Sequence, residues 1–296
     1  MKSHNNLLNI ENHVDRRRFL QKSGIASVGI AGAALLGGTA TMLGESSASA
    51  HDNAQSSPLS ANDVAILNFA LNLEYLEAEF YTKATTGKTL AEIGIPVSGV
   101  GDPGPTVGGT LVNFAEDDGE RNTDENEDAC VRTVAQQIAE DEQHHVLLLR
   151  SVLGDKAIAK PEINLNALGL VKNRSNFLRE ARAFEDVGVS AYGGAAPLIQ
   201  SKTVLGAAAR IALTEGEHTG LLRLLVALND VRTTPLDGQD IVPPPSGKEY
   251  FSNNAEGLTI VRTPSEVLAI VFGSSKPGTK SGAFFPDGVN GFINTV

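Results

Sequence analysis

Two copies of one spacing contain most of the side chains with which this chain could do chemistry. Each copy has a glutamate seven residues before a tyrosine, followed later by a glutamate three residues before a histidine. The members are Glu74, Tyr81, Glu142 and His145 in the first copy, and Glu185, Tyr192, Glu215 and His218 in the second. Residues three apart share a helix face, so each Glu-x-x-His presents a carboxylate and an imidazole together. Four carboxylates and two imidazoles from four helices are what a bundle uses to hold two transition-metal ions.

Carboxylate and imidazole ligands favour iron, manganese or zinc, whereas a structural zinc site would need thiolates. Cys130 is the single cysteine, and we expect it to be a small buried residue. The glutamates of the two Glu-x-x-His motifs, Glu142 and Glu215, would bridge two ions. The other two glutamates would be terminal ligands, and each histidine would bind one ion. The alternative is a polar, metal-free core, but charges in the middle of apolar stripes are costly unless they are coordinated.

Four further polar side chains are predicted to surround these ligands: Glu77, Tyr81, Asp141 and Tyr192. Asp141 is a candidate acceptor for the N–H of a ligand imidazole. Thr214 occupies the matching position of the second copy, so the two metal positions would differ. Glu77 lies one turn from Glu74 and competes with it as a ligand. Each tyrosine either hydrogen-bonds a carboxylate across the core or packs as a ring. His144 would point about 100° away from its neighbouring ligand, toward the surface or the outer part of the site.

Apolar residues at spacings of three and four predict four helices that position these side chains. The expected helices run from residue 60 or 62 to about 83, and over about 127–153, 172–200 and 203–229. Pro197 is expected to kink or end the third. The connection 155–171 is long enough to cross the length of a bundle. The pattern therefore predicts an all-α four-helix bundle over residues 61–229, made of two helical pairs joined by a long crossover.

Two irregular regions flank or interrupt the predicted bundle. Residues 85–128, rich in glycine, proline and acidic side chains, form an insert between the first two helices, and such long connections are usually functional or poorly ordered. Residues 230–296 form a C-terminal extension with one predicted short helix, because Thr263 and Glu266 can make a capping box. The segment 284–288 is expected to pack back on the bundle.

The first fifty residues are typical of an export signal. They contain the twin-arginine core RRRFL at 16–20, an uncharged Ala/Gly-rich stretch at 23–44, and the cleavage motif ASA at 48–50. The alternative is an uncleaved membrane anchor. With cleavage, residues 51–60 would be a flexible leader. We therefore predict recognition by the twin-arginine export machinery and a periplasmic or other extracytoplasmic location.

The charge balance limits the partners of the mature chain. The first fifty residues hold five basic and three acidic side chains, so the remainder carries 19 basic and 32 acidic residues, a net charge of −13. Such a surface disfavours nucleic acid and anionic membranes as partners. No later segment is long and apolar enough to span a bilayer.

Several local stretches carry a family resemblance. They are LEYLEAEFY at 73–81, FEDVGVSAY at 184–192, GAAP at 194–197 and FFP at 284–286. With them, residues 61–296 resemble the ferritin-like superfamily, and more narrowly the exported bacterial relatives of plant desiccation-related proteins. The resemblance implies a four-helix bundle with a carboxylate-bridged dimetal site. The wider superfamily includes ferroxidases, peroxidases, manganese catalases and oxygenases, which act on Fe(II), peroxide or dioxygen.

The leading functional hypothesis is an exported protein with a di-iron or di-manganese centre that handles iron or peroxide during envelope stress or desiccation. The alternative is a non-enzymatic protective or structural bundle, with metal as a staple or absent. Oxygenase-type oxidation of a substrate would need an apolar pocket beside the ions. The insert and the extension depart from compact storage ferritins, which disfavours an iron-storing cage, while a homo-oligomer is compatible with the sequence.

Overall fold

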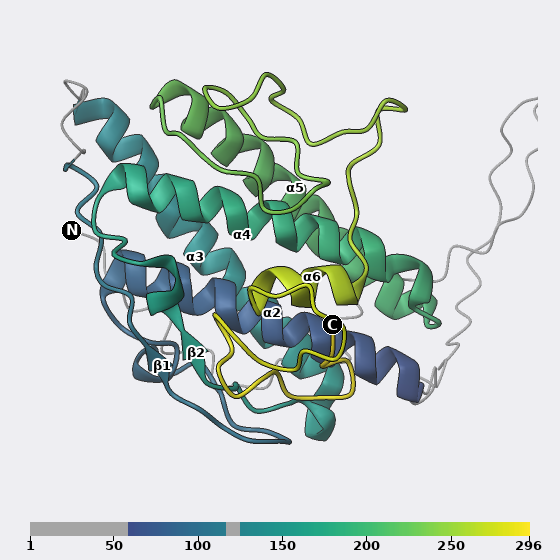
Figure 1. The fold of residues 1–296 in the computed structure, drawn as a ribbon. Helices are drawn as coiled ribbons and strands as arrows, with labels where there is room; N and C mark the ends of the chain where they lie inside the picture. Colours follow the sequence, from purple (N-terminus) through teal and green to yellow (C-terminus); the bar gives the residue numbers. More distant parts are fainter. Residues whose placement is uncertain (1–58, 117–124) are drawn as a thin grey trace, which may run out of the picture.

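The structure is a computed structural model that describes residues 59–116 and 125–296 of the 296-residue chain. Its main body is four long helices, which lie side by side in Figure 1. They are α2 (Ala61–Thr86), α3 (Glu125–Leu153), α4 (Arg174–Ala195) and α5 (Lys202–Leu228). Helix α2 packs mainly against α3, and α4 packs mainly against α5. This arrangement confirms the predicted all-α bundle of two helical pairs.

The ends of the helices follow local rules. The Ser60 side chain caps α2 by accepting a hydrogen bond from the backbone N–H of Asp63, and Gly87 ends this helix with a left-handed φ of 75°. Helix α4 ends at Ala195, earlier than expected, and continues as the 3-10 turn η5 (Ala196–Leu198). Pro197 lies in this turn and has no N–H with which to continue the α-helix.

The insert between α2 and α3 runs beside the crossover between α3 and α4. Strand β1 (Thr106–Val107) in the insert pairs in parallel with strand β2 (Ile163–Asn164) in the crossover. The short 3-10 turns η2 (Ala91–Ile93), η3 (Gly154–Lys156) and η4 (Leu165–Leu168) complete these segments. The described part of the insert is therefore held against the bundle by backbone pairing.

A buried network of ion pairs joins the bundle to the C-terminal extension. Asp186 on α4 lies 2.6 Å from Arg182 and 2.7 Å from Arg223 of α5. Arg182 also reaches Asp240 of the extension at 2.6 Å. Arg223 donates to the backbone oxygen of Tyr250 at 2.7 Å. Because both arginines are almost fully buried, each needs these acceptors to offset its lost hydration.

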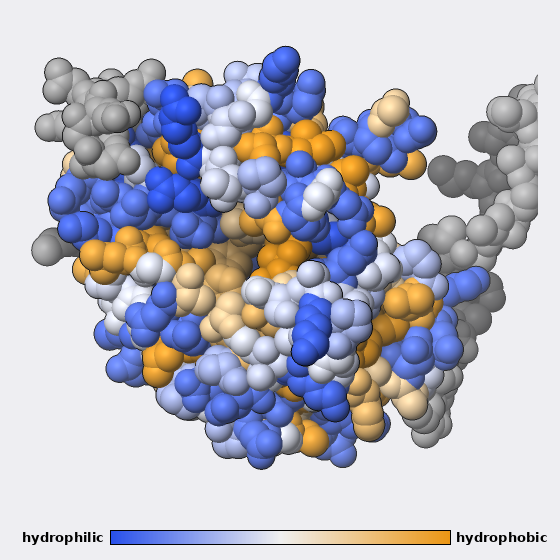
Figure 2. Space-filling view, viewed as in Figure 1, coloured by the Kyte–Doolittle hydropathy of each residue, from blue (hydrophilic) through white to orange (hydrophobic). Residues whose placement is uncertain are grey.

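The extension contains α6 (Pro264–Val271), which begins with the predicted capping box of Thr263 and Glu266. The segment around Phe285 packs back as expected, and that ring is fully buried. Beyond it, Asn72 and Asn290 exchange two hydrogen bonds of 2.8 and 3.1 Å. Figure 1 shows α6 and the chain that follows it lying over α2 and α4. Figure 2 shows apolar surface gathered in a hollow between α4 and α6.

Two sequence expectations concern residues at or beyond the limits of this structure. The predicted export signal and nearly all of the leader fall on residues 1–58, which lie outside the described residues. Within the described ranges, no helix is long and apolar enough to cross a membrane. The expectation that Cys130 is buried was wrong, because this side chain is exposed near the start of α3.

Candidate metal centre

The four long helices bring the six predicted ligands into one buried cluster. Helix α2 contributes one glutamate, α4 contributes another, and α3 and α5 each contribute a glutamate and a histidine three residues later. The four glutamates are 0 % exposed and the two histidines 7 % exposed: Glu74, Glu142, His145, Glu185, Glu215 and His218. The i, i+3 spacing therefore places each carboxylate and imidazole on the same inward face of its helix.

The ligand atoms form two groups. In each group, one atom from each of four residues lies within 4.8 Å of all the others. The first group contains Glu74 and His145, and the second contains Glu185 and His218; Glu142 and Glu215 belong to both. These two shared residues are the glutamates of the Glu-x-x-His motifs, for which the sequence predicts a bridging role. The two imidazole rings lie 6.5 Å apart, centre to centre.

Three carboxylates converge on one nitrogen of His145. Its Nδ1 lies 3.3 Å from Glu74 Oε2, 3.3 Å from Glu142 Oε2 and 3.3 Å from Glu215 Oε1. A ring nitrogen carries at most one hydrogen, so it cannot satisfy three oxygens at once. The second imidazole is similar, since His218 Nδ1 lies 3.2 Å from Glu185 Oε2 and 3.3 Å from Glu142 Oε1.

Several carboxylate oxygens of the cluster lack hydrogen-bond partners. Among the described residues, the buried oxygens without such a partner include Glu74 Oε2, Glu142 Oε1, Glu185 Oε1 and both oxygens of Glu215. Leaving a buried oxygen unsatisfied costs about 1–3 kcal/mol, more if it is charged. Metal coordination would remove this cost, because it uses the same lone pairs. The donor set, with oxygen and nitrogen but no sulfur, fits iron, manganese or a non-structural zinc ion.

Burial and the charges of neighbouring groups both shift the pKa values of the cluster carboxylates. Burial raises the pKa of Glu74 to about 7, and it raises the pKa of Glu215 well above its usual range. Burial alone would also raise the pKa of Glu142, but the nearby imidazoles of His145 and His218 hold it below its usual range. Glu142 is therefore the most strongly ionised carboxylate of the cluster.

Burial acts on the two imidazoles in the opposite direction, because it lowers their pKa values. Burial lowers the pKa of His145, but the charges of Glu74 and Glu142 outweigh it and raise this pKa far above 6.5. For His218, burial is likewise outweighed, and hydrogen bonds to neighbouring carboxylates, Asp141 first, raise the pKa to about 12. Without metal, both histidines therefore hold protons that a metal would have to displace.

Asp141 distinguishes the two halves of the site. Its Oδ2 lies 3.2 Å from His218 Nε2, so a residue of α3 supports an imidazole of α5. Because a carboxylate only accepts, the facing Nε2 carries the hydrogen and Nδ1 points at the ligand group. The matching Thr214 instead donates to the carbonyl of Arg210 in its own helix, at 3.2 Å. The predicted asymmetry between the halves is thus present in the geometry.

Both tyrosines contact a carboxylate of the cluster. The hydroxyl of Tyr192 donates a hydrogen bond to Glu74 Oε1, across the core from α4 to α2. The hydroxyl of Tyr81 hydrogen-bonds the carboxylate of Glu185 across the core from α2 to α4. It also lies 3.5 Å from the carbonyl of Ala181, and the ring of Tyr81 packs edge-on against Phe177.

Glu77 stands apart from the ligands. Among the residues that the structure describes, it belongs to neither ligand group, although it is only 4 % exposed. Burial, followed by the charges of neighbouring carboxylates, raises its pKa well above its usual range. The sequence predicted that Glu77 competes with Glu74, and the structure separates the two, because Glu77 faces an apolar cavity. His144 is exposed, in line with its expected direction.

Three residues of this cavity were not singled out from the sequence: Leu168 in η4, Leu236, and Ile270 in α6. Phe284, from the segment predicted to pack back on the bundle, also lines the cavity. Nothing in the local sequence of these residues shows that they meet at one place. A side chain at Gly188 would lie 2.6 Å from Glu215 Oε2, so Gly188 permits close approach of the helices.

Comparisons with known proteins agree with this architecture. A family model described as "Ferritin-like domain" matches residues 62–228, which contain all six candidate ligands. The chain is 26% identical over 183 residues to desiccation-related protein PCC13-62 of Craterostigma plantagineum. This match covers 56% of the chain and 53% of the plant protein, so it spans about half the length of that relative. No solved structure matches the chain.

Proposed function

Because the chain belongs to the family of proteins with a ferritin-like domain, we propose that its buried cluster holds two ions of iron or manganese. The protein would use them to handle iron or peroxide. The observation that carries this proposal is the set of three carboxylate oxygens around His145 Nδ1, each at 3.3 Å. One hydrogen cannot satisfy three oxygens, whereas a cation in their midst can.

The positions of the residues suggest a separate role for each of them in the proposed metal site. Glu142 and Glu215, which belong to both ligand groups, would bridge the ions. Asp141 holds the hydrogen of His218 at Nε2 and keeps Nδ1 free for coordination. Tyr192 fixes the orientation of the Glu74 carboxylate by hydrogen bonding. The two ions, when bound, would supply the electrons exchanged with dioxygen or peroxide, or the site that oxidises Fe(II).

The setting of this chemistry is also part of the proposal. The twin-arginine pattern at residues 16–20 supports export by the twin-arginine machinery to the periplasm or another extracytoplasmic space. The likeness to a plant desiccation-related protein supports a role in drying or envelope stress. An exported stress protein that removes iron or peroxide would limit oxidative damage where the cytoplasmic enzymes do not reach.

A second candidate function is a protective or structural bundle without turnover. The observation that favours it is the complete burial of the four glutamates, each 0 % exposed. Ions held in such a site would join four helices firmly and stabilise the fold even if no substrate reached them. In this case the metal is a staple, and protection comes from the folded protein itself.

The test begins with elemental analysis of protein purified from its native exported location. We expect close to two ions of iron or manganese per chain. A protein that binds neither ion near this ratio would contradict the proposal. Fe(II) oxidation and peroxide consumption are then measured for the wild type, for the double variant Glu142→Ala/His145→Ala, and for the control His144→Ala.

The variants separate the two candidate functions. For an enzyme, the double variant keeps its helical circular dichroism but loses turnover by a factor of 100 or more, on the order of the effect of removing metal ligands. The control, which changes the exposed neighbouring imidazole, should behave like the wild type. If the wild type binds metal but shows no turnover, and the double variant still protects dried cells, the structural role is supported.

A further inference from the structure

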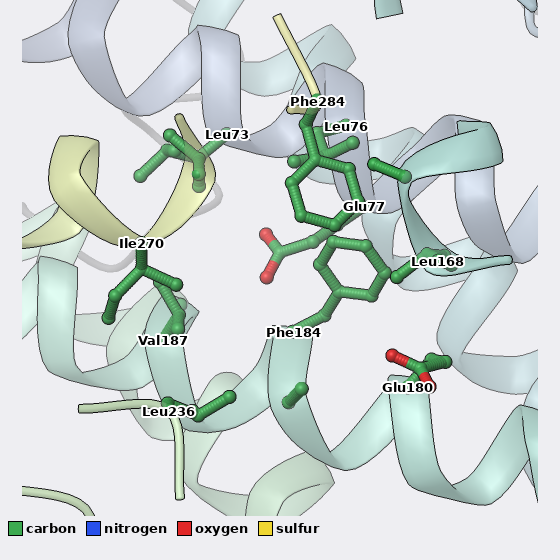
Figure 3. Close-up of a pocket in the computed structure, with 14 residues that line it drawn as sticks. Leu73, Leu76, Glu77, Leu168, Glu180, Phe184, Val187, Leu236, Ile270 and Phe284 are labelled. Atoms are coloured by element: carbon green, nitrogen blue, oxygen red, sulfur yellow. The ribbon is translucent and has the colours of Figure 1, made fainter. Parts of the chain in front are cut away.

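An apolar cavity of about 300 Å³ lies between α2, α4, α6 and the crossover. Fourteen residues line it, and only two of them, Glu77 and Glu180, have polar side chains. Figure 3 shows the Glu77 carboxyl group pointing into the space between Phe284 and Ile270, while Glu180 lies at one side. Enclosed space with mostly apolar walls and a few polar groups is typical of a small-molecule site.

The outer wall of this cavity comes from outside the matched domain. The inner wall is formed by α2 and α4 of the bundle, with residues such as Leu73 and Phe184. Leu236, Ile270 and Phe284 close the opposite side, and all three follow residue 228, where the family match ends. The hollow between α4 and α6 in Figure 2 lies at this junction of bundle and extension. The extension therefore turns an open helix surface into a partly enclosed pocket.

The cavity touches the metal cluster at Gly188. This residue lines the cavity, and a side chain there would lie 2.6 Å from Glu215 Oε2 and 2.8 Å from Glu77 Oε1. Glu215 Oε2 is also one of the buried oxygens without a hydrogen-bond partner among the described residues. Because Gly188 has no side chain, the cavity wall at this residue lies close to Glu215, a candidate bridging ligand.

We propose that this cavity binds a linear apolar molecule that ends in one small neutral polar group, and that Glu77 hydrogen-bonds that group. An apolar cavity of about 150 Å³ holds a benzene molecule, so about 300 Å³ suits a chain of roughly ten to twelve heavy atoms. An alcohol or aldehyde head fits better than a carboxylate, because the two polar side chains that line the cavity, Glu77 and Glu180, both carry carboxyl groups, and no basic side chain among the described residues lines it.

The position of the cavity beside the cluster suggests a class of substrate for the metal centre. This part of the inference rests on the proposed function. The head group would lie beside Glu77 and Gly188, against the carboxylate of Glu215, while the chain would run between α2 and α4 toward the extension. Small polar reactants such as peroxide leave such an apolar space unexplained. A medium-chain alcohol or aldehyde fills it and brings one end of the molecule to the cluster.

The test uses 1-decanol, titrated by isothermal calorimetry into metal-free protein. We expect saturable binding of one molecule per chain. Ala183 lines the cavity, so Ala183→Phe should fill it and weaken binding at least tenfold. Ala209→Phe makes the same change on the exposed face of α5 and should leave binding unchanged. Thermal unfolding and circular dichroism establish that both variants fold.

The head group is tested at Glu77. Glu77→Gln keeps a hydrogen-bonding group and should bind 1-decanol about as well as the wild type, whereas Glu77→Leu should bind it roughly tenfold more weakly. Decanoate, with its charged head, should bind more weakly than 1-decanol. Absent or unsaturable binding of 1-decanol, or equal binding by the wild type and a folded Ala183→Phe variant, would overturn the proposal.

The outcome is independent of whether the cluster holds metal, because the titration uses metal-free protein. If 1-decanol binds but the cluster takes up no ions, the dimetal function fails and the cavity remains a binding site. If the cluster does take up ions, the distance between ligand and metal is tested with 1-decanol carrying ¹³C at its hydroxyl carbon. Protein loaded with Mn(II) should broaden this signal strongly and Zn(II)-loaded protein should not; equal line widths would place the molecule elsewhere.

Discussion

Metal uptake at pH 7 should release several protons from the cluster. In the metal-free protein, the raised pKa values of His145 and His218 keep both imidazoles protonated at pH 7. The pKa of Glu215 is raised well above its usual range by burial and by neighbouring carboxylates. The pKa of Glu74 lies at about 7, so this group is about half protonated.

The size of the effect follows from these states. Metal ligands bind in their deprotonated form, so two ions displace both imidazole protons and about half of the proton of Glu74. We therefore expect between about two and three protons released per chain at pH 7. The overall binding constant for two ions should then rise by a factor on the order of 100 or more for each unit of pH.

The assay is calorimetric titration with Mn(II) at pH 7 in two buffers of different ionisation enthalpy, such as PIPES and HEPES. The difference in observed heat gives the number of protons released. His145→Asn should release about one proton fewer, and His144→Asn, which changes an exposed neighbour, should match the wild type. A release below one proton per chain, or equal values for His145→Asn and the wild type, would refute the reasoning.

Three further predictions concern stability. Asp186→Asn leaves two buried arginines without their shared carboxylate and should lower the free energy of unfolding in urea by about 3–5 kcal/mol; a loss under 1 kcal/mol would contradict this. Gly194→Ala places a side-chain carbon 1.9 Å from a backbone oxygen of the extension and should cost about 1–3 kcal/mol, whereas Gly216→Ala meets no atom within 4 Å and should be neutral or stabilising. Burial raises the pKa of Glu74 from 4.5 to about 7, so its contribution is complete below pH 4.5 and lost as the pH rises through 7. The metal-free protein should therefore lose up to about 3 kcal/mol from this group, and Glu74→Gln should have a flatter profile of Tm against pH; an equally steep profile would rule out Glu74 as the cause.

The helices and the six candidate ligands could be predicted because their signals are local. Ser60 caps α2 and Thr263 caps α6 as their types and neighbours indicate. The i, i+3 spacing of Glu142 and His145 determines their common face before any other helix is considered. Local chemistry of this kind does not depend on how the helices pack.

Other features depend on packing between distant segments and had no local signal. Asp141 could be identified as an acceptor, but that it supports His218 of α5 follows from the approach of two helices. The pairing of β1 with β2 joins two loops that show no strand pattern. The cavity beside Glu77 needs the crossover and the extension to meet at one place, and sequence periodicity contains no information on that meeting.

The hydrogen bonds between Asn72 and Asn290 have a consequence for how the chain folds. The two residues are 218 positions apart, so one side of the first long helix is covered only by residues that the ribosome adds much later. Contacts at such separation need a large loop to close before they contribute free energy, which slows folding. The surface of α2 around Asn72 should therefore stay exposed during synthesis until the segment that contains Asn290 has been made.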